Sequence, residues 1–121
     1  MESLYYALGG ETGLDSLVEA MYRRVLADPE LRPFFDGLDM AQQHNKFRAF
    51  LQTISGGPVR RSGIELRAAH SASVESGLSE RHFDAFVSHL GAALAEAGHG
   101  DDIIRTTTGR LNETKADVLG L

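Results

Sequence analysis

The sequence contains no cysteine, no tryptophan and only three prolines. Without cysteine the chain can form neither a disulfide nor a thiolate metal site, so its composition leaves the redox compartment open. No stretch approaches the roughly 18 apolar residues of a membrane span, and the first residues do not show the charged and apolar regions of a signal peptide. We therefore expect a cytoplasmic protein with no membrane partner.

An excess of positive charge is also lacking. The chain has 12 lysines and arginines against 17 aspartates and glutamates, which gives a net charge of -5. This balance supplies no basic field for nucleic acid or for an anionic membrane surface. A chain of 121 residues is about the length of one domain. We expect a single domain over residues 1–121 that works as a monomer.

Apolar residues recur at intervals of three and four, and no segment shows the alternation typical of a strand, which predicts an all-α fold. Helices are expected over residues 3–8, 12–26, 39–54, 64–77, 79–98 and 101–119. Thr12, Asp39 and Ser79 are the expected N-terminal caps of three of them. Residues 55–63 form the clearest loop, because they include three glycines and a proline. Three threonines and a glycine at 106–109 predict an irregular middle for the last helix.

His70 lies four residues after Leu66 and four before Val74, so all three lie on the same side of a helix. A histidine on an apolar face is either a core residue with a satisfied hydrogen bond or a metal ligand. A zinc site needs three or four protein ligands, and no paired or clustered set accompanies this histidine. A single imidazole is sufficient for an iron that is already held in haem.

Polar residues interrupt two other apolar faces. Gln43 and His44 stand between Met40 and Phe47, where a continuous apolar stripe would need apolar residues. Burying such groups without a partner costs about 1 to 3 kcal/mol, so they face water, each other or a ligand. Tyr22 lies on a buried stripe, either as a core residue with its hydroxyl bound to the backbone or as a group that faces a ligand.

The remaining histidines and acids give no further site. His82, His89 and His99 lie at helix starts, off the stripes or in a turn, and we expect them at the surface. The acids form no close pair for acid/base catalysis, and the paired glycines do not follow a strand as a phosphate-binding loop would.

Five segments follow one another over almost the whole chain: LYYALGG, MYRRVLADPELRPFFDGLDM, KFRAFLQTISGGP, LRAAH and RHFDAFVSHLGAALAEAG. In this order and spacing the chain closely resembles the group I truncated haemoglobins of bacteria and algae. The resemblance implies a two-over-two helical sandwich around haem b. It also implies that the glycine pairs at 9–10 and 56–57 end helices.

The resemblance assigns roles by position. It implies that His70 is the proximal iron ligand and that Tyr22 and Gln43 face the bound gas. Lys46 matches a position from which a side chain can reach the iron as a sixth ligand, or point outward to a haem propionate, and His44 is the next candidate. The residues expected to contact haem are Phe35, Phe47, Phe50, Leu66 and Phe83.

The chain also departs from the family pattern. Arg61, Ser62 and Gly63 replace a common Tyr-Thr-Gly sequence, which puts the usual propionate contacts in doubt, and Leu66 stands where methionine is common. Phe47 occupies a position that is a second glutamine in several members, which predicts a simpler distal network.

The function implied by the resemblance is reversible binding of O2 and other diatomic gases (NO and CO) by ferrous haem, for oxygen transport or sensing. The alternative is an NO dioxygenase that converts O2 and NO to nitrate. We find no flavin or nicotinamide domain in the sequence, so that enzyme would need a separate reductase. A third interpretation, without haem, is a small helical interaction module.

Overall fold

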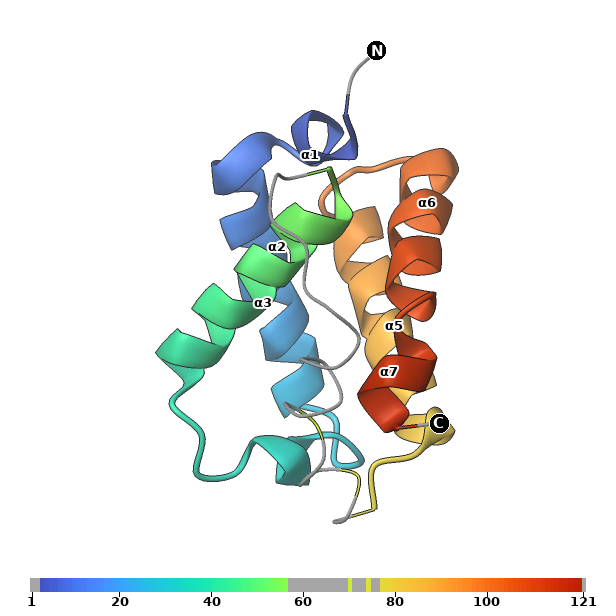
Figure 1. The fold of residues 1–121 in the computed structure, drawn as a ribbon. Helices are drawn as coiled ribbons and strands as arrows, with labels where there is room; N and C mark the ends of the chain where they lie inside the picture. Colours follow the sequence, from blue (N-terminus) through green and yellow to red (C-terminus); the bar gives the residue numbers. More distant parts are fainter. Residues whose placement is uncertain (1–2, 57–69, 71–73, 75–76, 121) are drawn as a thin grey trace.

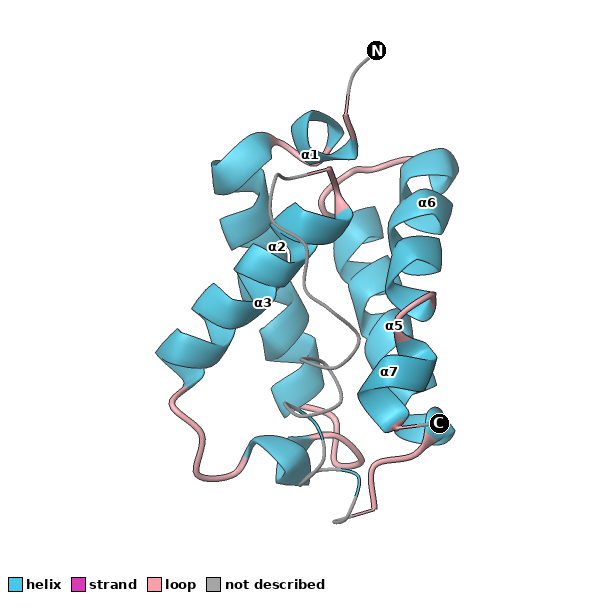
Figure 2. Ribbon diagram, in the orientation of Figure 1, coloured by secondary structure: helices cyan, strands magenta, loops and turns pink. Residues whose placement is uncertain are grey.

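The computed structural model describes residues 3–56, 70, 74 and 77–120, and every structural statement below concerns these residues. They form helices, turns and loops, and no strand occurs among them (Figure 2). The elements are α1 (Leu4–Ala7), α2 (Gly10–Leu26), the 3-10 helix η1 (Arg32–Phe35), α3 (Met40–Ile54), α5 (Glu80–Glu96), α6 (Asp101–Asn112) and α7 (Lys115–Leu119). The predicted all-α fold is confirmed.

Two pairs of helices make the body of the molecule. α2 packs against α3, α5 packs against α6, and the two pairs meet chiefly where α2 contacts α5 (Figure 1). α1 lies across one end of this arrangement and contacts both α2 and α6. This is the two-over-two sandwich expected from the resemblance.

The core follows the predicted stripes. Positions three and four residues apart on α2 are fully buried, because one face of a helix repeats at that spacing. The largest fully buried apolar side chains of α2, α3 and α5 are Leu14, Val18, Met21, Val25, Leu51, Leu90 and Leu94. No helix in the described ranges is long and apolar enough to cross a membrane.

The first corner differs from the prediction. α2 begins at Gly10 with Gly9 as its cap, so Thr12 lies within the first turn and is not the cap. Gly9 has a φ of 95°, a left-handed conformation that glycine adopts without strain. At Gly13 an added Cβ would lie 2.0 Å from the carbonyl oxygen of Leu8, so α1 and α2 meet too closely for any side chain there. Close backbone packing, which a cap pattern does not encode, determines where α2 begins.

The cap of α3 is as predicted. Asp39 precedes the helix, and its Oδ1 accepts hydrogen bonds from the backbone N–H groups of Ala41 at 3.1 Å and Gln42 at 3.3 Å. These contacts satisfy donors that the first turn of a helix leaves free.

The last predicted helix is broken at a different place. α6 continues through the threonine run, and the interruption falls at Glu113 and Thr114 before α7 begins. Thr107 Oγ1 donates to the carbonyl of Ile103 at 2.8 Å, and Thr108 Oγ1 donates to that of Ile104 at 2.7 Å. Because each hydroxyl bonds back to its own helix, the threonines are accommodated within it.

The predicted helix 64–77 falls mostly outside the described residues. His70 and Val74 are helical. Gly77 has a φ of 107°, and its N–H donates to the carbonyl of Val74 at 3.0 Å. A left-handed glycine bonded back to the preceding turn is typical of a helix end, in agreement with the predicted end at residue 77.

Candidate functional site

A cavity of about 410 Å³ lies among the helices, and its described lining is mostly apolar. α2, η1, α3, α5, α6 and α7 contribute side chains, and His70 joins them from the segment between α3 and α5. The apolar lining is Leu31, Phe34, Phe35, Leu38, Phe47, Phe50, Leu78, Phe83, Phe86, Leu111 and Val118. The polar lining is Tyr22, Gln43, Lys46, His70, His82 and Thr114. An apolar hollow with a few polar groups is the usual form of a cofactor site.

The structure brings the sequence-predicted site residues together in this one cavity. Those that line it are Tyr22, Phe35, Gln43, Lys46, Phe47, Phe50, His70 and Phe83. Leu66 lies outside the described residues. His44 is on the same helix as Gln43, but it is absent from the lining and packs against Tyr22 instead.

Tyr22 and Gln43 form the polar pair of the cavity. Tyr22 is only 1% exposed, and its hydroxyl oxygen accepts a hydrogen bond from Gln43 Nε2 at 3.3 Å. Burial raises the pKa of Tyr22 to about 12, although the bond from Gln43 acts in the opposite direction. The hydroxyl therefore stays protonated at neutral pH. Since it accepts from the amide, its own hydrogen is the one it can donate.

Aromatic rings surround this pair. Phe47 stacks on Phe50 with ring centroids 6.0 Å apart, and it meets Phe86 edge to face at 5.3 Å. Tyr22 contacts Phe35 and Phe47 in the same edge-to-face manner. Such packing holds the rings in place and forms an apolar wall beside the polar pair.

His70 and Lys46 are two further basic groups in the described lining of the cavity. His70 is half-buried and helical, and Lys46 is exposed on α3 and forms no ion pair with any described residue. Within the described ranges, no group of three or more histidine, aspartate or glutamate side chains could hold a metal ion. The described donor set therefore offers single ligands and not a complete protein cage, which is what an iron already held in a macrocycle requires.

Known proteins match this chain over nearly its whole length. Residues 3–119 match the family described as bacterial-like globin. The chain belongs to this family. It is 42% identical over 105 residues to the group 1 truncated hemoglobin GlbN of Synechocystis sp., covering 86% of this chain and 85% of that protein. It is 34% identical over 119 residues to the group 1 truncated hemoglobin of Tetrahymena pyriformis, covering 98% and 96%.

Solved structures agree with this globin assignment. The crystal structure of the 2/2 hemoglobin from Synechococcus sp. PCC 7002, described with covalently attached heme, matches with a TM-score of 0.92 at 36% identity over 99% of this globin and all of that chain. Truncated hemoglobin from Tetrahymena pyriformis in the Fe(III) form matches with a TM-score of 0.87 at 33% identity over 98% of each chain. The resemblance to group I truncated haemoglobins is therefore confirmed.

Haem b is the cofactor of globins, and the described residues of this globin fit it. A flat macrocycle needs apolar faces to pack against and one axial nitrogen ligand. The stacked Phe47 and Phe50 and the neighbouring Phe83 offer the first, and the imidazole of His70 offers the second. The pair of Tyr22 and Gln43 adds polar groups for a small ligand.

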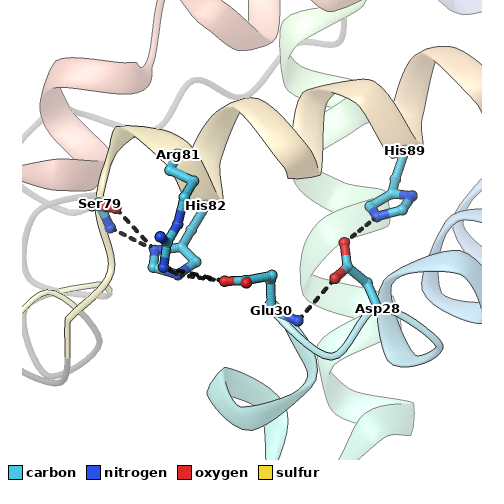
Figure 3. Close-up of polar contacts among 6 residues, drawn as sticks. All are labelled: Asp28, Glu30, Ser79, Arg81, His82 and His89. Carbon is cyan, nitrogen blue, oxygen red and sulfur yellow. Dashed lines mark hydrogen bonds and ion pairs between the residues drawn. The ribbon is translucent and has the colours of Figure 1, made fainter.

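A second set of polar residues lies apart from the pair of Tyr22 and Gln43, and only its His82 is in the described cavity lining. We call this set the polar corner (Figure 3). It joins the turn after α2 to α5 and the cap of α5, and it consists of Asp28, Glu30, Ser79, Arg81, His82 and His89. His89 Nε2 lies 2.8 Å from Asp28 Oδ2, and Arg81 Nη2 lies 3.2 Å from Glu30 Oε2. The hydrogen bond from His89, helped by the backbone N–H of Glu30, holds the pKa of Asp28 below its usual value.

The expected surface position of His82 is wrong. His82 is 7% exposed, lines the cavity and packs its ring against Phe34 at 4.9 Å between centroids. Its Nδ1 accepts the backbone N–H of Ser79 at 3.0 Å. This bond closes the capping box of α5, a role that glutamate or glutamine usually fills, so the usual sequence signature is absent. His89 and His99 are half-buried instead of exposed.

Proposed function

We propose that this globin binds haem b through His70 and reversibly binds O2 and other diatomic gases beside Tyr22 and Gln43. One observation carries the proposal. The buried, hydrogen-bonded pair of Tyr22 and Gln43 and the half-buried His70 line the same aromatic cavity. Haem supplies the ferrous iron that binds the gas. The residues of the chain supply attachment, exclusion of water and selectivity.

His70 gives the cofactor its protein ligand. A neutral imidazole offers a nitrogen lone pair to iron, and Phe83 and Phe86 on α5 add apolar surface to the same cavity. Phe47 and Phe50 on α3 offer flat surfaces for packing against the macrocycle.

Tyr22 and Gln43 act on the gas. Ferrous haem would polarise a bound O2 more than a bound CO, so a hydrogen-bond donor in the cavity would favour O2. With its oxygen engaged by Gln43, the Tyr22 hydroxyl donates its hydrogen toward the ligand. A single such bond is worth about 1 kcal/mol, and more where charge develops.

Lys46 is the possible sixth ligand in this proposal. Its amine must lose a proton before it can bind iron, because an ammonium group has no free lone pair. If the amine turns inward, a low-spin six-coordinate spectrum will grow as pH rises and disappear in Lys46→Ala. A low-spin spectrum that persists in this variant identifies another ligand. No such spectrum at any pH leaves Lys46 pointing outward.

The decisive experiment is haem binding by His70→Gly. We expect the purified protein to show a Soret band that shifts on reduction and on addition of CO, and His70→Gly to lose haem unless free imidazole is added. His99→Gly, a change at a half-buried histidine outside the cavity lining, is the matched control and keeps haem. Unchanged haem binding in His70→Gly contradicts the ligand assignment. No Soret band in any form supports the non-haem interaction module.

NO dioxygenation is the alternative activity of the same site. Mixing the O2 complex with NO in a stopped-flow instrument, followed by turnover with a reductase and its electron donor, separates the two. Sustained nitrate production with consumption of the donor supports the enzyme. A single stoichiometric reaction without turnover supports a gas-binding protein.

A further inference from the structure

The ring of Tyr22 is held by three aromatic neighbours of two kinds. Phe35 and Phe47 meet it edge to face, with centroids 5.6 Å and 5.9 Å away and planes at 77°. His44 lies flat on it, with centroids 4.8 Å apart and planes 15° from parallel. His44 is half-exposed and does not line the cavity, whereas Tyr22 is buried and does. The imidazole therefore supports the phenol from outside the cavity.

The flat contact with His44 restrains tilting of the Tyr22 ring, which the edge-to-face contacts with Phe35 and Phe47 restrain less. A hydrogen bond loses strength steeply as its distance and angle depart from their preferred values, so a small tilt of the ring weakens any bond that its hydroxyl donates. The bond from Gln43 is 3.3 Å long, beyond the usual range for N–H···O, and fixes the hydroxyl only weakly. A ring stacked on one face of Tyr22 prevents it from tilting toward that side.

We propose that His44 is the positioning residue of the distal tyrosine. Its flat ring keeps the Tyr22 hydroxyl directed into the cavity and thereby sets the preference of this globin for O2 over CO. The inference rests on the proposed role of Tyr22. It requires the planar shape of the His44 side chain and neither its charge nor a bond to iron.

Two variants of similar size test whether the flat shape of the His44 ring matters or only the volume that the side chain fills. In the haem-loaded protein we expect His44→Leu to raise the O2 dissociation rate about three- to tenfold, which is the range that aromatic stacking energies correspond to. His44→Phe keeps a flat ring, and we expect it to stay within about twofold of the natural protein. CO dissociation changes little in both. Asn45→Ala, at the exposed neighbour on α3, is the matched control and leaves both rates unchanged.

A spectroscopic signature and a double mutant test whether the effect acts through Tyr22. The C–O stretching band of the CO complex reports polar donors near the ligand. His44→Leu should move it toward the band of Tyr22→Phe, while His44→Phe should not. In the Tyr22→Phe background, His44→Leu should have no further effect on O2 dissociation. If His44→Leu does not retain haem, His44→Gln removes the flat ring while keeping a side chain suited to a half-exposed position.

Three results overturn the inference. One is an unchanged O2 rate and C–O band in His44→Leu or His44→Gln. Another is a rise in the O2 dissociation rate of His44→Phe as large as that of His44→Leu. The third is an undiminished effect of His44→Leu in the Tyr22→Phe background, where the hydroxyl is absent. If Tyr22→Phe itself leaves O2 dissociation unchanged, the proposed role of Tyr22 fails as well, so failure of this inference alone is distinguishable.

Discussion

The pair of Tyr22 and Gln43 lies in the cavity lining, whereas the polar corner reaches this lining only through His82. The two regions use their hydrogen-bonding groups in opposite ways. Tyr22 and Gln43 share one long bond of 3.3 Å within aromatic walls. In the polar corner, the contacts of Asp28 with His89 and of Ser79 with His82 are 2.8 Å and 3.0 Å. Groups that satisfy each other hold the fold together. A buried group that keeps a donor unused is available to a ligand.

The largest expected effect is a loss of folding stability at high pH that comes from the buried Tyr22. The pKa of Tyr22 is raised to about 12 in the folded protein, compared with 10.0 in its unperturbed state. The contribution of the neutral Tyr22 to the free energy of unfolding is therefore complete below pH 10. About 2 to 3 kcal/mol of it is lost as pH rises toward 12. Denaturant unfolding of the natural protein and of Tyr22→Phe across this interval measures the difference. Parallel stability curves for the two proteins contradict the burial of the phenol.

The next prediction tests whether the Tyr22 hydroxyl donates a hydrogen bond to the bound gas. Tyr22→Phe removes the donor while keeping the ring, and we expect O2 dissociation to become about tenfold faster, the equivalent of about 1.4 kcal/mol. CO dissociation, measured by ligand replacement, should respond much less. Equal effects on the two gases would mean that Tyr22 acts only through packing.

The third prediction expects the opposite pattern, in which stability falls and gas binding does not change. Asp28→Asn should lower the free energy of unfolding by about 1 kcal/mol at neutral pH and leave O2 dissociation unchanged. Because the pKa of Asp28 is lowered in the folded state, its contribution is present above the unperturbed value of 3.8 and is lost as pH falls below it. The exposed Asp36→Asn is the matched control. A faster O2 dissociation in Asp28→Asn would break the distinction between the two regions.

The smallest effect concerns the cap of α5. His82→Ala should cost about 1 kcal/mol or less, because it removes the acceptor for the Ser79 N–H. His82→Gln should recover most of that stability, since glutamine supplies the same acceptor in a capping box. Thermal unfolding of the two variants makes the comparison. An equal loss in both would assign the role of His82 to its contact with Phe34.

The sequence predicts what is periodic or local. Apolar stripes define the helices, and Asp39 marks the start of α3, because these signals lie within one or two turns. The stack of His44 on Tyr22 and the burial of His82 against Phe34 join residues from different elements. No local pattern encodes such pairs. The sequence marked His44 as a polar residue on an apolar face but predicted a surface position for His82, and only packing reveals the partner of each.

The close approach of α1 to α2 makes Gly13 sensitive to substitution although it lies outside the cavity lining. A Cβ on Gly13 would lie 2.0 Å from the Leu8 carbonyl oxygen, so every other amino acid forces this corner apart. Gly13 does not line the haem cavity. In a mutational scan scored by survival of the folded protein, Gly13 would rank with the most sensitive positions, whereas His44, half-exposed on α3, would tolerate many replacements. Only a scan scored by gas kinetics would separate residues that build this molecule from those that tune it.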